Sequence, residues 1–146
     1  VDGKRHRAWP YLANFCGIGE KHSNNVVQSV AGLYASHPEE SKDENFGTTC
    51  RKLLGDDERK KLNQADGIGP VSRRFQHLLA AEGDEIFDRV VRLALRAKSQ
   101  GISVNYEQLY KDLLDWEYHA DRVRVRWAQR FWTPEVELEV EVEESP

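Results

Sequence analysis

Long apolar runs and clustered cysteines are both missing from this sequence, and each absence excludes a class of protein. No apolar stretch approaches the roughly 20 residues that a membrane-spanning helix needs, so we predict no membrane association. Cys16 and Cys50 are the only cysteines and form no CxxC pair, which argues against a disulfide scaffold, a zinc site or a redox centre. The basic stretch KRHRAWP at residues 4–10 lacks the apolar segment of a secretory signal. We therefore expect a cytoplasmic protein.

Recognisable catalytic motifs are missing as well. The sequence contains no HExxH pair, no GxSxG turn and no phosphate-binding P-loop. The histidines, at positions 6, 22, 37, 77 and 119, are not spaced as ligands of one metal ion. The acids Asp112, Asp115 and Asp121 lack the histidine or second acid that would indicate a nuclease. We predict a protein without enzymatic activity, and without a cofactor or a metal ion.

What the sequence does contain is a heavily charged exterior around an apolar interior. Its 146 residues are 39% apolar and 32% charged, as in a globular protein. A chain of this length buries roughly 70% of its unfolded surface. That is enough for one compact domain, or for two small helical halves that share a core.

The net charge of −4 is unevenly distributed along the chain. Residues 134–146, PEVELEVEVEESP, hold six glutamates and no cation. Of the 25 acidic residues 19 then remain in residues 1–133, against 21 lysines and arginines, which gives this part a charge of about +2. The overall charge is therefore a poor guide to the partner, and the layout of the cations matters more.

Apolar residues recur at helical spacing in an N-terminal part that we place at residues 1–55. A first helix is predicted after Ser23, as its N-cap, and Pro38 ends it. A polar loop then leads to a short helix over 45–54, which Gly55 terminates. The inward positions of these helices are Val26, Val27, Val30, Leu33, Tyr34, Phe46, Cys50, Leu53 and Leu54.

A polar connection over residues 56–69, with room for one helical turn, leads to a C-terminal part at 70–133. Pro70 suits the first turn of a helix. Asp84 can cap a long helix that ends near Gly101. The inward positions are Phe75, Leu78, Leu79, Ile86, Phe87, Val90, Val91, Ala94 and Leu95.

Two further helices and a tail complete the prediction. Asn105, with Gln108 three residues later, resembles a capping box, and a separate last helix covers residues 121–132. In the tail at 134–146, valine and leucine alternate with glutamate, which fits either an amphipathic strand or, the interpretation we favour, an acidic extension. The predicted fold is all-α: a compact helical bundle in two small halves with an acidic C-terminal tail.

Arginines line up beside the apolar faces of two predicted helices. One row, at spacing i, i+4, i+8, consists of Arg122, Arg126 and Arg130. The apolar row one residue further on consists of Val123, Trp127 and Phe131. Because one residue turns a helix by about 100°, the two rows occupy adjacent faces. A second arrangement sets Arg89, Arg92 and Arg96 beside Val90, Leu93 and Ala97, and Arg73 and Arg74 add a pair.

These rows predict a surface that grips phosphate. A planar guanidinium binds phosphate through two parallel hydrogen bonds, whereas lysine is a point charge. The alternative is that the charges merely solvate helix faces and pair within a helix, as Glu85 with Arg89 and Asp88 with Arg92 could. The row that contains Arg126 has no acid at i+4 or i−4, so we expect its guanidinium groups to remain available.

A second candidate for phosphate binding is DGIGP at 66–70, echoed by CGIGE at 16–20. A Gly-Ile-Gly turn between helices is the centre of the helix-hairpin-helix module, whose backbone amides hold a phosphate. Leu62 and Phe75 could supply flanking contacts, but Arg73 stands where close packing wants a small residue. A DNA-binding accessory module of this kind therefore stays open as an alternative. So does a protein-interaction adaptor whose arginines bind acidic protein surfaces.

The order of several segments resembles the CasB family, the small subunit of the type I-E CRISPR surveillance complex Cascade. The segments are Trp9-Pro10, VAGLYASHP at 30–38, NFGTTCRKLL at 45–54, RRFQHLLAA at 73–81, DRVVRLALRAKSQGISVNYEQLYKDLLDW at 88–116 and RVRVRWAQRFW at 122–132. Together they cover most of the chain, and their series carries the resemblance, because none is a catalytic signature.

The resemblance implies a non-enzymatic helical subunit in the cytoplasm of a prokaryote. It implies that two copies bind other Cascade subunits and stabilise the guide RNA–target DNA duplex and the displaced strand, and so the R-loop in antiviral defence. Carried over to this sequence, the phosphate-contacting candidates are Arg51, Lys52, Arg73, Arg74, Arg96, Lys98, Arg122, Arg126 and Arg130. Thr48 stands where relatives often have a basic residue, and the tail lies outside the family pattern.

Overall fold

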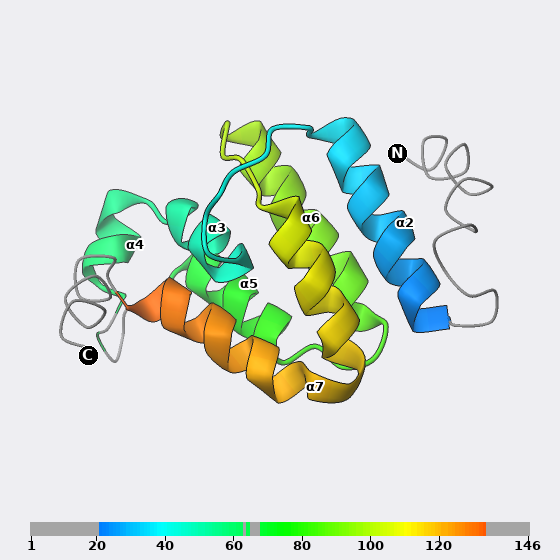
Figure 1. The fold of residues 1–146 in the computed structure, drawn as a ribbon. Coiled ribbons are helices and arrows are strands. Elements are labelled where there is room, and N and C mark those ends of the chain that lie inside the picture. Colours follow the sequence, from blue (N-terminus) through cyan, green and yellow to red (C-terminus); the bar gives the residue numbers. More distant parts are fainter. Residues whose placement is uncertain (1–20, 63, 65–67, 134–146) are drawn as a thin grey trace, which may run out of the picture.

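The computed structural model describes residues 21–62, 64 and 68–133. This part of the chain is all-α and contains no strand, which confirms the predicted fold class (Figure 1). Its helices are α2 (Lys21–Ser36), α3 (Phe46–Lys52), α4 (Asp56–Lys60), α5 (Pro70–Leu79), α6 (Glu85–Ser99) and α7 (Tyr106–Trp132). The predictions for CGIGE at 16–20 and for the tail at 134–146 lie outside the described residues.

The longest helix, α7, is bent and forms the spine of the molecule. At His119 the backbone leaves the helical region (φ −134°, ψ 37°), so α7 consists of two straight segments. In Figure 1 the first segment, in yellow, runs beside α2, and the second, in orange, turns back beneath α3. The predicted separate helix at 121–132 is therefore wrong only in its start, because the helix continues through residues 106–132 with a bend.

One continuous core joins the N-terminal and C-terminal helices. Its buried apolar residues come from α2 and α3 as well as from α5, α6 and α7. Among the largest fully buried side chains are Phe46 of α3, Phe75 of α5 and Trp127 of α7. The two parts predicted on either side of residues 55 and 70 therefore contribute side chains to the same core.

Helix α3 packs against the second segment of α7 at very short range. The Asn45 side chain caps α3 by accepting a hydrogen bond from the Gly47 amide (2.9 Å) and donates one to the Arg126 carbonyl (3.2 Å). A Cβ at Gly47 would lie 2.1 Å from the carbonyl oxygen of Trp127. Glycine is therefore required here because two backbones approach each other closely.

The loop after α2 is held to the start of α7 by polar contacts. His37 Nε2 lies 2.7 Å from the Ile102 carbonyl oxygen, and the Asn105 side chain donates a hydrogen bond from Nδ2 to the Asp43 carbonyl (2.6 Å). The Glu40 and Val104 backbones form an isolated bridge. These hydrogen bonds pair polar groups of a loop for which the sequence predicted only that it is polar.

Several predicted helix ends are confirmed. Pro70 occupies the first turn of α5, and Asn105 caps α7 by accepting from the Gln108 amide (3.0 Å). Gly83 and Gly101 have positive φ values of 56° and 70°, a backbone conformation that disfavours other residues.

One predicted N-cap is wrong, because Ser23 lies inside α2, which already includes Lys21 and His22. Asp84 does occupy the N-cap position of α6, as predicted, but its side chain makes no capping hydrogen bond. Its carboxylate instead lies 3.2 Å from Lys21 Nζ of α2, a contact that the local sequence does not predict.

Candidate nucleic-acid interface

The apolar rows beside the arginines are buried as predicted. Val123, Trp127 and Phe131 of α7 are fully buried, and so, within a few per cent, are Val90, Leu93 and Ala97 of α6. Burial of these rows fixes the orientation of α6 and α7 about their own axes. The arginines one residue away must therefore lie at the margin of the packed interior.

Four arginines from two helices converge on one hollow of about 280 Å³. Arg74 comes from α5, and Arg89, Arg92 and Arg96 come from α6, with Leu93 as an apolar wall. We call these residues the arginine pocket. Positive charge in a concave surface concentrates the electrostatic field, which favours an anion over a cation or a neutral ligand.

Most guanidinium groups of the arginine pocket have no acidic partner in the part of the chain that the structure describes. Arg92 lies 3.1 Å from the Asp88 carboxylate, which confirms one predicted i, i+4 pair. Within residues 21–62, 64 and 68–133, no ion pair involves Arg74, Arg89 or Arg96; the predicted pair between Glu85 and Arg89 is therefore wrong. The pocket consequently retains positive charge that its own helix does not neutralise.

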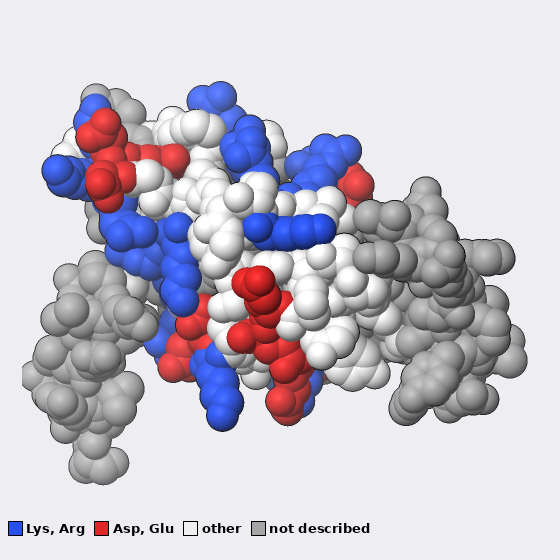
Figure 2. All heavy atoms as spheres, turned by 90° about the horizontal axis from the view of Figure 1, so that it is seen from above, with Lys and Arg blue, Asp and Glu red and all other residues white. Residues whose placement is uncertain are grey.

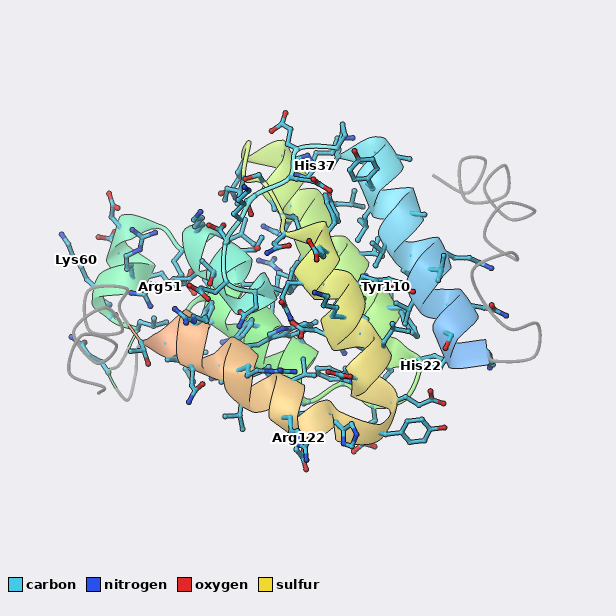
Figure 3. The ribbon with its side chains drawn as sticks, in the orientation of Figure 1. His22, His37, Arg51, Lys60, Tyr110 and Arg122 are labelled. Carbon is cyan, nitrogen blue, oxygen red and sulfur yellow. The ribbon has the colours of Figure 1, made fainter. Side chains whose placement is uncertain are left out.

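Three further candidates are exposed and lack acidic partners in the described part of the chain. Arg73 lies on α5 and Lys98 in the last turn of α6. Arg122 lies on the second segment of α7, at the lower edge of the molecule in Figure 3. Figure 2 shows basic side chains in separate groups, some beside acidic ones and others on uncharged surface.

Arg126, whose side chain is about half exposed, reaches a polar network around a buried carboxylate. Asp112 is 1% exposed and accepts hydrogen bonds from Trp127 Nε1 (2.8 Å) and Gln108 Nε2 (2.9 Å). Arg126 lies 3.5 Å from the same carboxylate and 3.6 Å from that of Asp115. A buried carboxylate needs such partners, so Arg126 compensates a charge of the protein itself.

Arg130, Arg51 and Lys52 also make contacts within the protein. Arg130 lies 3.3 Å from the Glu44 carboxylate, and Lys52 lies 2.7 Å from that of Asp43. Arg51 donates a hydrogen bond to the Phe131 carbonyl, near the C-terminal end of α7. The expectation that the arginine row of α7 stays unpaired is therefore wrong for Arg126 and Arg130, whose acids come from the first segment of α7 and from the loop before α3. It holds for Arg122, which has no acidic partner in the described residues.

Arg124 is an important basic residue that the sequence pattern does not single out. Its Nε donates to the Leu79 carbonyl (2.6 Å) and its Nη2 to the Ala81 carbonyl (2.9 Å). The guanidinium also lies over the Trp116 ring, 5.0 Å from its centroid. Arg124 thus joins α7 to the C-terminal end of α5, a role that only the arrangement of helices reveals.

The N-terminus of α5, which a helix-hairpin-helix would present to phosphate, is occupied by a carboxylate. Glu58 of α4 accepts hydrogen bonds from the Ser72 amide (2.8 Å) and hydroxyl (2.9 Å), and from the Val71 amide (3.4 Å). A Cβ at Gly69 would meet the Glu58 side chain at 2.4 Å. Since Glu58 already uses the amides that the module needs, the geometry disfavours this alternative.

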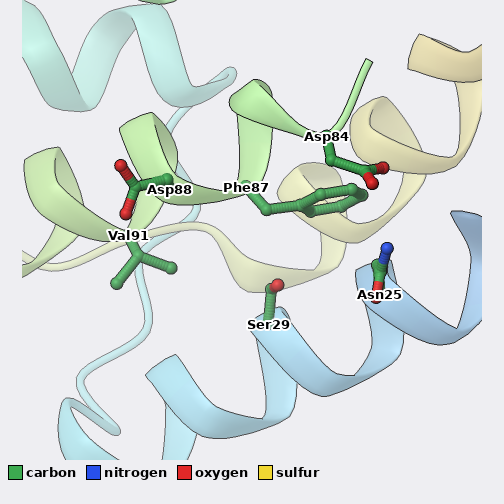
Figure 4. Close-up of a pocket in the computed structure, with 6 residues that line it drawn as sticks. All are labelled: Asn25, Ser29, Asp84, Phe87, Asp88 and Val91. Carbon is green, nitrogen blue, oxygen red and sulfur yellow. The ribbon is translucent and has the colours of Figure 1, made fainter.

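A second hollow, of about 300 Å³, lies between α2 and α6 and has the opposite character. Figure 4 shows Asn25 and Ser29 of α2 facing Phe87 of α6, and Asp84 and Asp88 complete the charged lining. The lining contains no lysine or arginine, and its two carboxylates pair with Lys21 and Arg92, so the hollow offers a polyanion no unpaired cation. Phosphate contacts are therefore expected at the arginine pocket and not here.

Neither membrane spans nor metal-ligand groups occur in the described residues. No helix there is long and apolar enough to cross a bilayer. No three histidine, cysteine or acidic side chains gather there as potential ligands of a metal ion.

Comparison with known families agrees with the resemblance drawn from the sequence. The profile of the CRISPR-associated protein Cse2 family matches residues 2–132, nearly the whole chain. The chain belongs to the Cse2 family. The match by order of segments was therefore informative although no single segment is a signature.

Solved structures of Cse2 and CasB proteins share the fold. CasB from Thermus thermophilus is 21% identical, with a TM-score of 0.65 over 87% of this chain and 71% of that protein. A CRISPR-associated protein of the Cse2 family, also from Thermus thermophilus, is 23% identical, with a TM-score of 0.66 over 88% and 75%. CasB from M. ruber is 23% identical, with a TM-score of 0.66 over 95% and 78%. No curated protein sequence matches the chain.

Proposed function

We propose that this Cse2-family chain is a non-enzymatic small subunit of a type I-E Cascade complex. In this role it binds the guide RNA–target DNA duplex and the displaced strand, without reading their sequence, and stabilises the R-loop. Its partners are the other Cascade subunits, a second copy of itself and the nucleic acids, in the cytoplasm of a prokaryote.

The arginine pocket carries this proposal. It sets four guanidinium groups around one hollow, and three of them have no acidic partner in the described residues. Guanidinium groups bind phosphate oxygens in pairs of parallel hydrogen bonds. Such contacts position a protein on nucleic acid but carry no base information. The pocket therefore suits a subunit of a complex in which base pairing does the reading.

Modest protein contacts are sufficient for this role. Formation of an RNA–DNA heteroduplex replaces a DNA duplex of similar stability, so the exchange is nearly balanced. A few phosphate contacts can then shift the equilibrium toward the open R-loop.

The candidate residues differ in whether they already make contacts within the protein. We place Arg74, Arg89 and Arg96 at the centre of the interface, with Arg73, Lys98 and Arg122 as further contacts. Arg51, Lys52, Arg126 and Arg130 already bind groups of the protein. Each of these four would have to give up or share an internal contact to bind a phosphate.

A salt titration with variants tests the proposal. If each copy engages about three phosphates, the logarithm of the affinity for DNA should fall with the logarithm of salt concentration at a slope of about −2 to −3. Arg74→Ala combined with Arg96→Ala should weaken binding to every sequence alike and make the slope less steep. Fluorescence anisotropy with two unrelated oligonucleotides measures both effects.

A matched control distinguishes the effect of the arginine pocket from the effect of losing two positive charges anywhere on the surface. Lys21→Ala with Lys111→Ala removes the same charge from residues that pair with Asp84 and Glu107 at exposed positions. This control should retain most of the affinity. Equal losses in both variants, or a slope near zero for the unaltered protein, would refute the proposal. Binding only to acidic proteins would favour the adaptor alternative.

A further inference from the structure

The acidic tail is the part of this chain that the Cse2 family does not explain. The family profile ends at residue 132, and the glutamates begin at 135. Residues 134–146 contain six glutamates, no lysine and no arginine. A run of like charge is usually an interaction segment, and its preferred partner has the opposite charge.

The chain leaves α7 next to the helix that carries Arg74. Phe131 stacks on Phe75 of α5, with ring centroids 4.1 Å apart, and Trp132 contacts the same ring edge-on at 5.3 Å. Phe75 follows Arg74 directly in the sequence. Thr133, the last described residue, therefore lies within a short distance of α5, and the tail follows it directly in the sequence.

The tail is long enough to reach the whole arginine pocket. Thirteen residues span up to about 43 Å when extended, at roughly 3.3 Å per residue. The pocket lies between α5 and α6, and the 15 residues of α6 extend over only about 22 Å, at roughly 1.5 Å per residue. No unwinding of α7 is needed for the glutamates to arrive at Arg89 or Arg96.

The chemistry of the pocket fits glutamate as well as phosphate. A carboxylate and a guanidinium form the same paired hydrogen bonds as a phosphate and a guanidinium. Arg74, Arg89 and Arg96 have no carboxylate partner elsewhere in the described residues. Leu93 adds an apolar wall, and valine and leucine alternate with glutamate in the tail.

We propose that residues 134–146 bind the arginine pocket of their own chain and compete there with nucleic-acid phosphates. This inference rests on the proposed function, because it assigns a regulator to the same site. Tethering gives the tail an effective concentration of about 1 mM, so that even weak contacts fill the pocket. The isolated protein then binds free nucleic acid only weakly. Nucleic acid that the assembled complex holds next to the pocket displaces the tail.

Removal of the tail is the first test. A chain that ends at Thr133 keeps every described helix and should bind single-stranded DNA about tenfold more tightly at 100 mM salt. This factor is expected when a tail at an effective concentration of about 1 mM competes for the pocket with a dissociation constant of about 0.1 mM. Changing all six glutamates to glutamine should act alike. A synthetic peptide of residues 134–146 should reduce DNA binding by the shortened chain, and the glutamine peptide should not.

Because loss of six negative charges favours DNA binding even without contact, a second test measures contact directly. A nitroxide spin label is attached at Val140→Cys in a Cys16→Ser background, where Cys50 is buried and unreactive. Amide signals of α5 and the pocket side of α6 should broaden, and those of α2 should not. The broadening should disappear when DNA is added or when the glutamates are changed to glutamine. A mixture of labelled and isotope-enriched chains excludes contact between copies.

The outcomes distinguish failure of this inference from failure of the proposed function. Unchanged affinity on tail removal, or absence of broadening at α5 and α6, overturns tail binding and leaves the proposed function intact. If the tail broadens these signals but neither form of the protein binds nucleic acid, tail binding stands and the proposed function fails.

Discussion

Asp112 is a charged residue inside this protein, and it organises the residues around the bend of α7. It comes from the first segment of α7, whereas Trp127 and Arg126 come from the second. Its carboxylate therefore bridges the two segments from within the buried interface between them. A polar bond of this kind specifies one arrangement of the segments in addition to stabilising it.

Asp112→Ala should lower the free energy of unfolding by about 2 kcal/mol, because the buried indole N–H of Trp127 would lose its acceptor. Asp115→Asn is the matched control: it alters the other acid beside Arg126, and its side chain is half exposed. The control should change stability by less than about 0.5 kcal/mol. Urea unfolding followed by tryptophan fluorescence measures both values, and equal effects would contradict the role of Asp112.

Gly47 is a second residue whose identity follows from its surroundings. Gly47→Ala should cost about 2 kcal/mol or more, because its Cβ would overlap the Trp127 backbone and push α3 away from α7. Gly55→Ala provides the control, since a Cβ there would meet nothing within 4 Å. Thermal unfolding of both variants gives the comparison. A stable Gly47→Ala protein would show that α3 can shift without loss.

Cys50 gives a prediction about reactivity. Burial raises the pKa of its thiol well above the ordinary value, so the thiolate that reacts with alkylating agents is scarce at neutral pH. In a Cys16→Ser background, iodoacetamide should not modify the folded protein and should modify it fully in 6 M guanidinium chloride. Mass spectrometry detects the adduct. Rapid modification of the folded form would indicate that α3 opens readily.

At the scale of the helices, α7 is connected to its neighbours by arginine side chains as much as by apolar packing. Arg124 reaches the carbonyls at the end of α5, and Arg51 of α3 reaches the Phe131 carbonyl near the end of α7. Carbonyls at helix ends lack partners within their own helix, and these guanidinium groups supply them. Arginine therefore serves here as a structural connector, and the same residue type supplies the phosphate contacts that we propose for the arginine pocket.

Arg124→Lys should lower the free energy of unfolding by about 1–2 kcal/mol, because a single ammonium cannot reach the Leu79 and Ala81 carbonyls and also cover Trp116. Arg122→Ala, two residues away and exposed, should leave stability within about 0.5 kcal/mol of the unaltered protein. Arg122→Ala should instead weaken DNA binding slightly. If Arg122→Ala lowered the stability and Arg124→Lys did not, the structural role of Arg124 would be refuted.

At the scale of the whole molecule, the continuous core has a consequence for unfolding. Residues of the N-terminal and C-terminal helices are buried in one cluster, so neither set keeps its apolar surface covered without the other. Urea unfolding should be a single transition, with the same midpoint by far-ultraviolet circular dichroism and by tryptophan fluorescence. Two separate midpoints would show instead that the parts predicted at residues 1–55 and 70–133 unfold independently.

The sequence predicted the elements well where the signal is local. Pro70 and Asn105 mark helix starts, and the buried faces of α6 and α7 follow from spacing alone. The local signal failed at Ser23, which lies inside α2, and at Asp84 it gave the start of α6 but not the ion pair with Lys21. The sequence also predicted the family, because several segments in a fixed order are more specific to a family than any one segment.

What the sequence by itself determined is which face of each helix is buried, since helical periodicity and apolar side chains depend only on neighbours along the chain. Only the tertiary structure decided which arginines are available. Arg130 meets Glu44, an acid far away in the sequence, and Arg126 meets Asp112 across the bend of α7. Arg74 and Arg96 of different helices share a hollow without an acidic partner in the described residues. Electrostatic pairing depends on distance in space, which the packing of the helices and the bend in α7 determine.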